Sequence, residues 1–236
     1  MAASLSIAEI APHFPDFRVT LVVAEDLSLT TVRSPGLDDL IAEREDAARA
    51  RWAGLELSQI PGVAAWRAAY KGFGIKKTSY RSSVERLVKR VLAGERLPVV
   101  NTFVDIYNAV SLSHVFCCGA DDLAKVCPPL AFRYARPGDS FIDMAGPETG
   151  AGEDPPKDGE VVYADERHVL CRRWNWRQDA RTGIGPECRE AVLTLQANGW
   201  GDLDAATADL TELLAKHCGA RCRAATANAA SPIIAV

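Results

Sequence analysis

The hydrophobic pattern of the chain changes near Asp122, and this change limits the folds that are open to it. Helical periodicity dominates before it and short β-branched runs dominate after it. Helices are predicted over 38–52, from 61 onward, over 82–94, over 97–114 and over 202–217, and strands over 17–25, 130–135, 160–165, 168–176 and 190–197. An alanine-rich tail to Val236 is expected to be ordered only in part. Helices in the first half and a mainly antiparallel sheet in the second predict an α+β fold, with 1–236 as a single domain.

Composition is that of an ordinary globular protein. The 236 residues are 25% charged and 48% hydrophobic, and the chain is long enough to bury a sizeable core. No apolar run approaches the length that spans a bilayer, and the start, MAASLSIAEIAPHF, lacks the basic and apolar regions of a secretory signal. We therefore expect a cytoplasmic protein with no membrane partner.

The cysteines and the common catalytic motifs limit the chemistry. Seven cysteines without a CxxC spacing fit a reducing compartment better than a disulfide framework. The nearest metal-ligand sets do not repeat a known spacing, so neither a metal nor a cofactor is expected. These sets are His217 with Cys218, Cys222 and Cys188, and His114 with Cys117 and Cys118. Because GxGxxG, GxxxxGK[ST], HExxH and GxSxG motifs are absent, an enzyme of this sequence would act mainly by positioning and hydrogen bonding.

Positive charge is concentrated between Lys71 and Arg96, although the formal net charge is −4. Eight basic and two acidic residues give this stretch a local excess of +6. Such a patch can bind phosphates because screened attraction is local, but a solvated helix face explains the charge equally well. The candidate phosphate-binding residues are Lys71, Lys76, Lys77, Arg81, Lys89 and Arg90.

Two segments carry polar side chains in unusual patterns. In the helix predicted over 97–114, Asn101, Asp105 and Asn108 lie opposite the apolar face. Asn and Asp are poor helix formers, so a functional or internally hydrogen-bonded role is favoured over a solvated face. The stretch CRRWNWRQD, residues 171–179, read as a strand, places a row of donors on one face and two tryptophans on the other. The donor face would carry Arg173, Asn175 and Arg177.

Five separated motifs follow one another over about residues 61–194: LPVVNTFVDIYNAVSL, GADDL, LAFRYARPGDSF, DGEVVYAD and CRRWNWRQDARTGI. In this order they resemble the free-standing B3/B4 domain proteins, which are similar to the editing module of the bacterial phenylalanyl-tRNA synthetase β subunit. That module hydrolyses tyrosine wrongly esterified to its tRNA. The resemblance implies a trans-acting aminoacyl-tRNA deacylase whose ligand is the acceptor end of tRNA. Residues 202–236 lie beyond the resemblance.

The sequence departs from the synthetase pattern at the expected pocket. Asn101, Val104, Asp105 and Asn108 match the synthetase segment NNVVDVTN. At Gly119 to Asp122, by contrast, only the alanine and the final aspartate agree with Pro-Leu-His-Ala-Phe-Asp. A bulky cationic run replaces the Gly-rich pocket turn, so the amino acid removed should differ from tyrosine. Glu148 or Glu153, in the acidic loop, takes the place of the glutamate that reads the tyrosine hydroxyl.

The resemblance assigns roles to the polar residues. Asp105, Glu153 or Glu160 would hold the α-ammonium of the aminoacyl group, and Asn108, Asn175 or an arginine would stabilise the oxyanion. The further substrate-binding candidates are Asn101, Asp122, Arg173, Trp174, Trp176 and Arg177. The tryptophans would anchor the strand or stack on the terminal adenine, and the arginines would contact substrate or pair with surface acids.

Two other functions and the oligomeric state stay open. The chain could be a non-catalytic tRNA or amino-acid binding module, or an enzyme that acts on a small amino-acid ester or amide without RNA. A homo-oligomer is an open alternative to a monomer.

Overall fold

Two β-sheets form the framework of the protein, which was examined as a computed structural model that describes residues 3–75, 79–146 and 153–236. The four-stranded sheet is antiparallel throughout and has the order β3-β8-β2-β9. Its strands are β2 (Phe17–Glu25), β3 (Cys117–Asp122), β8 (Ala191–Asn198) and β9 (Arg221–Ala227). The six-stranded sheet has the order β10-β1-β4-β5-β6-β7, and β1 and β4 are its parallel pair. Its strands are β1 (Ser4–Ser6), β4 (Leu130–Tyr134), β5 (Val161–Ala164), β6 (Val169–Arg172), β7 (Arg177–Gln178) and β10 (Ile233–Ala235).

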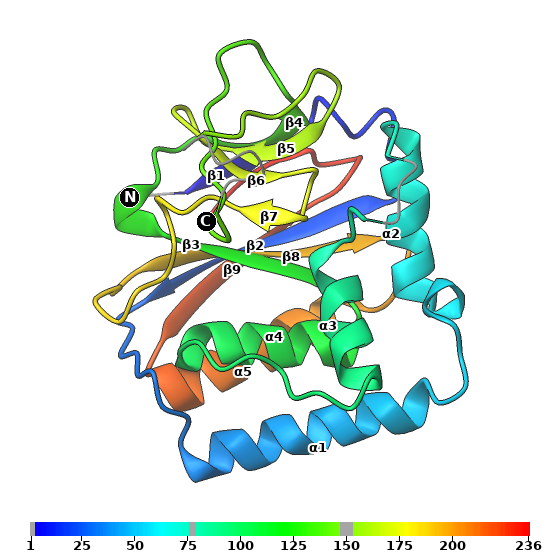
Figure 1. Ribbon diagram of the computed structural model, residues 1–236. Coiled ribbons are helices and arrows are strands. Elements are labelled where there is room, and N and C mark those ends of the chain that lie inside the picture. Colours follow the sequence, from blue (N-terminus) through cyan, green and yellow to red (C-terminus); the bar gives the residue numbers. More distant parts are fainter. Residues whose placement is uncertain (1–2, 76–78, 147–152) are drawn as a thin grey trace.

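The helices other than α2 (Pro61–Gly72) cover the face of the four-stranded sheet that is turned away from the six-stranded sheet, and α2 stands at the side of the sheets (Figure 1). The helices are α1 (Pro35–Arg51), α2 (Pro61–Gly72), α3 (Ser83–Leu92), α4 (Thr102–His114) and α5 (Leu203–Cys218), with short 3₁₀ turns η1 (Leu57–Gln59) and η2 (Leu123–Lys125). Local sequence sets their starts, because the side chains of Ser34, Ser82, Asn101 and Asp202 each accept a hydrogen bond from a backbone N–H of the first turn. Helix α1 lies outermost, and α4 lies between it and the four-stranded sheet (Figure 1).

Strand β2 is buried on both faces, which explains its continuous apolar sequence. Helix α5 covers one face, and aromatic residues of other elements cover the other. The ring of Phe17 makes edge contacts with those of Phe132 and Trp174, with centroid separations of 5.2 and 4.8 Å. Trp66 and Trp174 also meet edge to face at 5.4 Å. This aromatic cluster joins the two sheets and α2 through edge-to-face contacts, which aromatic pairs prefer.

The predicted α+β class is confirmed, but the division of the chain into a helical and a strand half is incomplete. β1 and β2 come from the first half and α5 from the second. The expectation of a partly ordered tail is wrong, because residues 221–227 form β9, an edge of the four-stranded sheet, and residues 233–235 form β10. β9 pairs with β2 along its whole length. The hydroxyl groups of Thr20 and Thr226 lie 2.8 Å apart across this pair.

Two features are absent from the described part of the chain. None of its helices combines the length and the apolar character needed to cross a membrane. Nor do three or more His, Cys, Asp or Glu side chains gather there in a way that could hold a metal ion.

Candidate functional site

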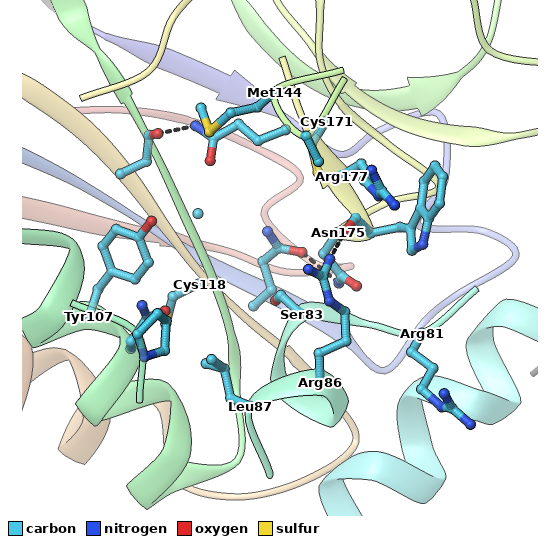
Figure 2. A pocket seen from close by; sticks show the side chains of 18 of the residues that line it. Arg81, Ser83, Arg86, Leu87, Tyr107, Cys118, Met144, Cys171, Asn175 and Arg177 are labelled. Atoms are coloured by element: carbon cyan, nitrogen blue, oxygen red, sulfur yellow. Dashed lines mark hydrogen bonds between the residues drawn. The ribbon is translucent and has the colours of Figure 1, made fainter. Parts of the chain in front are cut away.

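A cavity of about 750 Å³ lies between the β3 edge of the four-stranded sheet, helices α3 and α4, and the hairpin formed by β6 and β7. Tyr107 lies on one side of it and Asn175 and Arg177 on the other (Figure 2). Gly119 of β3 and Thr194 of β8, which are paired in register, both line the cavity. A Cβ atom added at Gly119 would meet no other atom within 4 Å, so the missing side chain leaves this part of the cavity open.

A chain of buried side-chain hydrogen bonds fixes the amides of the cavity. The Tyr70 hydroxyl donates to Asn175 Oδ1 at 2.9 Å, and Asn175 Nδ2 donates to Gln196 Oε1 at 3.0 Å. Gln196 Nε2 in turn donates to Thr194 Oγ1 at 3.0 Å. Because an amide nitrogen carries two hydrogens, and Gln196 is its one acceptor among the described residues, Asn175 has a further N–H to offer. The network therefore holds a donor of the cavity lining in a fixed orientation.

The strand predicted over 168–176 is wrong beyond Arg172. β6 ends at Arg172, β7 begins at Arg177, and the Trp176 N–H donates to the Arg172 carbonyl at 3.1 Å to close a tight turn. Arg173 and Trp174 have φ values of 45° and 68°, in the left-handed region that side chains disfavour. Burial of Trp174 in the aromatic cluster holds this conformation. The predicted alternation of faces is lost, since residues 173–176 form the turn.

The turn directs two arginines away from the cavity. Arg172 is buried, with Nη2 2.7 Å from Glu160 Oε1 and Nη1 2.6 Å from Asp154 Oδ2. The guanidinium of Arg173 lies over the rings of Tyr80 and Trp176 at 3.8 and 4.2 Å, and its Nε is 3.3 Å from the same Glu160 oxygen. Acids and aromatic rings hold these two arginines inside the protein. The arginines therefore neither form a wall of the cavity nor lie at the surface.

Arg177 and Trp176 do line the cavity, whereas Trp174 belongs to the core. Arg177 Nη1 lies 2.8 Å from Asp143 Oδ2, and its guanidinium lies 4.8 Å from the centre of the Trp176 ring. The hairpin thus presents one arginine, one tryptophan and Asn175 to the cavity.

The polar side chains of α4 divide into two groups. Asn101 caps the helix and donates to the Ile184 carbonyl at 3.1 Å. Asp105 accepts from Arg33 Nε at 2.8 Å and from the Val100 N–H at 2.9 Å. Neither lines the cavity, and their internal hydrogen bonds explain why poor helix formers occur there. Asn108, by contrast, lines the cavity with Asn175, so α4 and the hairpin each contribute an amide.

Other predicted residues lie outside the cavity lining. Glu160 is engaged with the hairpin arginines, and the exposed Glu153 accepts from Ser140 Oγ at 3.1 Å. Asp122 caps η2 and lies 3.0 Å from Lys125 Nζ, and Lys71 is exposed on α2. Lys76, Lys77 and Glu148 are not among the described residues.

The described basic residues from Arg81 to Arg90 border the cavity and are named the cationic rim. The rim consists of Arg81, just before α3, and of Arg86, Lys89 and Arg90 on α3. Arg81 Nε is 2.9 Å from Glu85 Oε1 and Arg90 Nη2 is 3.1 Å from Glu95 Oε2, so acids offset part of the charge. Arg86 extends toward Asn175 and donates to the Trp176 carbonyl at 3.1 Å (Figure 2).

Asp121 is a functional candidate that the sequence analysis missed. It lines the cavity, and Thr182 Oγ1 and Gln178 Nε2 both donate to its Oδ1, at 2.6 and 3.1 Å. Burial raises the pKa of Asp121 to about 7, although both hydrogen bonds lower it, and the carboxylates of Asp179 and Asp165 raise it further. The sequence CCGADD lacks the β-branched residues that indicate a strand, so the cavity-facing side of β3 could not be recognised.

The architecture defines an α+β domain with a ligand-sized cavity between its sheets and helices, lined by apolar side chains and a few polar groups. The family model for the B3/4 domain matches residues 65–199, more than half of the chain, and the chain belongs to this family. Among solved structures, the fold is similar to that of an N-terminal fragment of the phenylalanyl-tRNA synthetase beta-subunit from Pyrococcus horikoshii. The alignment covers 94% of this chain and 50% of the fragment, at 12% sequence identity and a TM-score of 0.45. The chain thus spans half the length of that fragment. No curated protein matches the chain.

Proposed function

We propose that the protein is a trans-acting editing deacylase, which hydrolyses the ester between a wrongly attached amino acid and tRNA. Its membership of the B3/4 domain family and the motif resemblance to synthetase editing modules support this function. The observation that carries the proposal is a cavity lined with fixed amide groups and bordered by the cationic rim. Phosphates of the acceptor end would lie along the rim, and the aminoacyl group would enter the cavity.

Hydrolysis needs donors that face the ester carbonyl. The second N–H of Asn175, which has no acceptor among the described residues, is one such donor. The side chain of Ser83 also lines the cavity, and its hydroxyl, which lies against the Cys117 thiol, would be a second donor after rotation toward the ester. These two residues are adjacent, because the Ser83 N–H donates to the Asn175 carbonyl at 3.0 Å. Each donor that binds the developing oxyanion contributes about 3 kcal/mol to lowering the barrier.

In the proposed reaction, water adds to the ester carbonyl and the bond from the carbonyl carbon to the ribose oxygen then breaks. The proton from water ends on that ribose oxygen, and the products are the free amino acid and tRNA. Aminoacyl esters are reactive enough for orientation and oxyanion binding to suffice, without a covalent enzyme intermediate. Trp176, at the cavity, would stack on the terminal adenine.

The test is the release of amino acid from a panel of mischarged tRNAs. Asn175→Ala should lower the rate roughly a hundredfold, as the loss of one oxyanion donor does in other hydrolases. Tyr70→Phe removes one of the two hydrogen bonds that orient Asn175 and keeps the bond to Gln196, so it should lower the rate less. Gly119→Val should abolish hydrolysis without unfolding the protein, because the added side chain projects into open space.

The controls separate the alternatives. Release from no member of the panel by the wild-type protein would exclude the hydrolase. Tight binding of tRNA without release would identify a binding module instead. If the protein hydrolyses a small amino-acid ester and added tRNA does not lower the rate, the protein is an enzyme that acts without RNA.

A further inference from the structure

Three carboxylates line the cavity among the described residues, and two of them are neutralised. Glu95 lies 3.1 Å from Arg90 Nη2, and Asp143 lies 2.8 Å from Arg177 Nη1. Asp121 has no cationic partner in the described part of the chain, although only 2% of its surface is exposed. A buried carboxylate without a counter-charge is costly, and a site that retains one is suited to a ligand that supplies the charge.

The hydrogen bonds of Asp121 leave one carboxylate oxygen for such a ligand. Thr182 and Gln178 both donate to Oδ1, and no described residue donates to Oδ2. Gln178 is itself fixed, because its Nε2 also donates to the Ala120 carbonyl. The carboxylate is therefore oriented by its neighbours through one oxygen only.

The surroundings of Asp121 favour a cation over an anion. Tyr107 and Tyr163 line the cavity with it, and the Tyr163 hydroxyl is buried without a partner among the described residues. Burial raises the pKa values of both phenols, so both are neutral at physiological pH. Phenol rings attract cations through their faces, and a phenol oxygen can accept a hydrogen bond from an ammonium group.

We propose that Asp121 is the binding residue for the α-ammonium group of the aminoacyl substrate, with Tyr107 and Tyr163 beside it. This inference rests on the proposed function and assigns the ammonium to a residue other than Asp105, Glu153 or Glu160, which do not line the cavity. Ammonium binding at Oδ2 leaves the ester at the Asn175 side of the cavity and sets the direction in which the aminoacyl group enters.

Proton release accompanies such binding. The carboxylates of Asp165 and Asp179 act on Asp121, and Tyr107 from α4, Tyr163 from β5 and Cys171 from β6 lie within reach of its charge. The cations of the same cavity are Arg86 from α3, which donates to the Trp176 carbonyl, and Arg177 from β7, which pairs with Asp143, and Asp179 pairs with Arg181. With a pKa of about 7, Asp121 is largely protonated at pH 6.5, and an arriving ammonium displaces this proton. Affinity then rises with pH through 7 and falls once the substrate amine deprotonates, near pH 8.

The experiment measures binding of adenosine analogues that carry an aminoacyl group through a 3′-amide, which resists hydrolysis. Each analogue in a panel of side chains is matched by an α-hydroxyacyl analogue, in which a hydroxyl replaces the ammonium. By calorimetry, the wild-type protein should bind at least one amine analogue roughly tenfold more tightly than its hydroxy counterpart, because charged hydrogen bonds are stronger than neutral ones. Asp121→Asn should bind the two equally. Asp39→Asn, which removes the same charge from the exposed side of α1, should keep the preference.

Each outcome decides the proposal. Equal affinity of the wild-type protein for amine and hydroxy analogues, no binding of any amine analogue, or a preference that persists in Asp121→Asn would overturn it. The wild-type protein alone provides a second measurement, which matters if Asp121→Asn does not fold. At pH 6.5, amine binding should release part of one proton, seen as a dependence of the heat on the ionisation enthalpy of the buffer, and zero release would overturn the assignment.

The deacylation panel separates this inference from the proposed function. Hydrolysis of mischarged tRNA together with equal affinity for both analogue types would leave the function intact and remove the role of Asp121. Ammonium-selective binding without hydrolysis would retain the role of Asp121 in a protein that binds and does not cleave.

Discussion

A buried carboxylate that lacks a counter-charge affects stability as well as binding, and Asp121 is such a group within the described part of the chain. Its two hydrogen bonds stabilise the ionised form, but burial and two neighbouring carboxylates outweigh them and raise its pKa. The folded protein therefore holds a proton at this position more tightly than the unfolded chain does. The group that we assign to substrate binding should make the empty protein less stable at neutral pH than it would be without the charge.

This effect can be measured as the difference in unfolding free energy between the wild-type protein and Asp121→Asn. An unfolded aspartate has a pKa of about 3.9, and the folded pKa is about 7. A carboxyl group with a raised pKa in the folded state makes a contribution to the free energy of unfolding that depends on pH. This contribution is complete below the pKa of the unfolded state and is lost as the pH rises through the pKa of the folded state. From pH 4 to pH 8, the unfolding free energy of the wild-type protein should therefore fall by up to about 4 kcal/mol relative to that of Asp121→Asn. Urea denaturation at several pH values measures this, and a difference that stays constant with pH would contradict the assigned pKa.

The hairpin of β6 and β7 depends on a different arrangement, in which charges are buried together. Glu160 contacts both Arg172 and Arg173, and Asp154 contacts Arg172 from the other side. The turn that these groups support carries Asn175 and Trp176 into the cavity lining. Its acids and arginines thus position cavity residues without lining the cavity themselves.

Glu160→Gln should destabilise the protein by about 3 kcal/mol, because it leaves Arg172 with an incomplete counter-charge in a buried site. Asp154 remains, so the cost should lie at the lower end of the range for broken buried pairs. Glu153→Gln makes the same chemical change at an exposed glutamate and should alter the unfolding free energy by less than about 0.5 kcal/mol. Chemical denaturation measures the unfolding free energy of both variants against that of the wild-type protein. Equal effects of the two glutamine variants would show that the buried pair does not hold the hairpin.

The helices could be predicted from sequence, whereas several strands could not. Helix starts depend on local signals, so the cap at Ser82 was sufficient, whereas the helix predicted from residue 97 begins only at Thr102, where the Asn101 side chain caps it. β3 and β9 exist because of pairing with β8 and β2, which are distant in the sequence, and neither strand has an apolar alternation of its own. The left-handed turn at Arg173 and Trp174 depends on the aromatic cluster, and the local sequence does not predict this cluster.

The same distinction applies to the cavity. Asn108 and Asn175 could be proposed because each is an amide in an apolar or aromatic setting, and both line the cavity. Asp105 is also a polar residue in an apolar setting, but it pairs with Arg33, which lies 72 positions earlier in the chain, and it does not line the cavity. Side-chain type indicated which residues are hydrogen-bonded inside the protein. Only the three-dimensional arrangement shows which of them face a ligand.

Charge across the molecule is divided in a way that suits an RNA end more than an extended RNA surface. The formal net charge of −4 repels nucleic acid in general, while the cationic rim gathers positive charge at the cavity. Attraction between exposed charges fades beyond a Debye length of about 8 Å, so phosphates near the rim would be attracted while more distant ones would not. This arrangement favours a small number of phosphate contacts and a modest dependence of affinity on salt.

Lys89→Ala should test this arrangement, because it removes one rim cation from the exposed side of α3. If this lysine contacts one phosphate, the slope of log affinity against log salt concentration should fall by about 0.7 to 0.9. Binding of non-hydrolysable aminoacyl-tRNA at several salt concentrations measures the slope. Arg167→Ala removes the same charge from an exposed turn between β5 and β6, outside the cavity lining, and should leave the slope unchanged. Equal changes in the two variants would mean that net charge, and not the rim, attracts the RNA; an unchanged slope in both would place the phosphates away from Lys89.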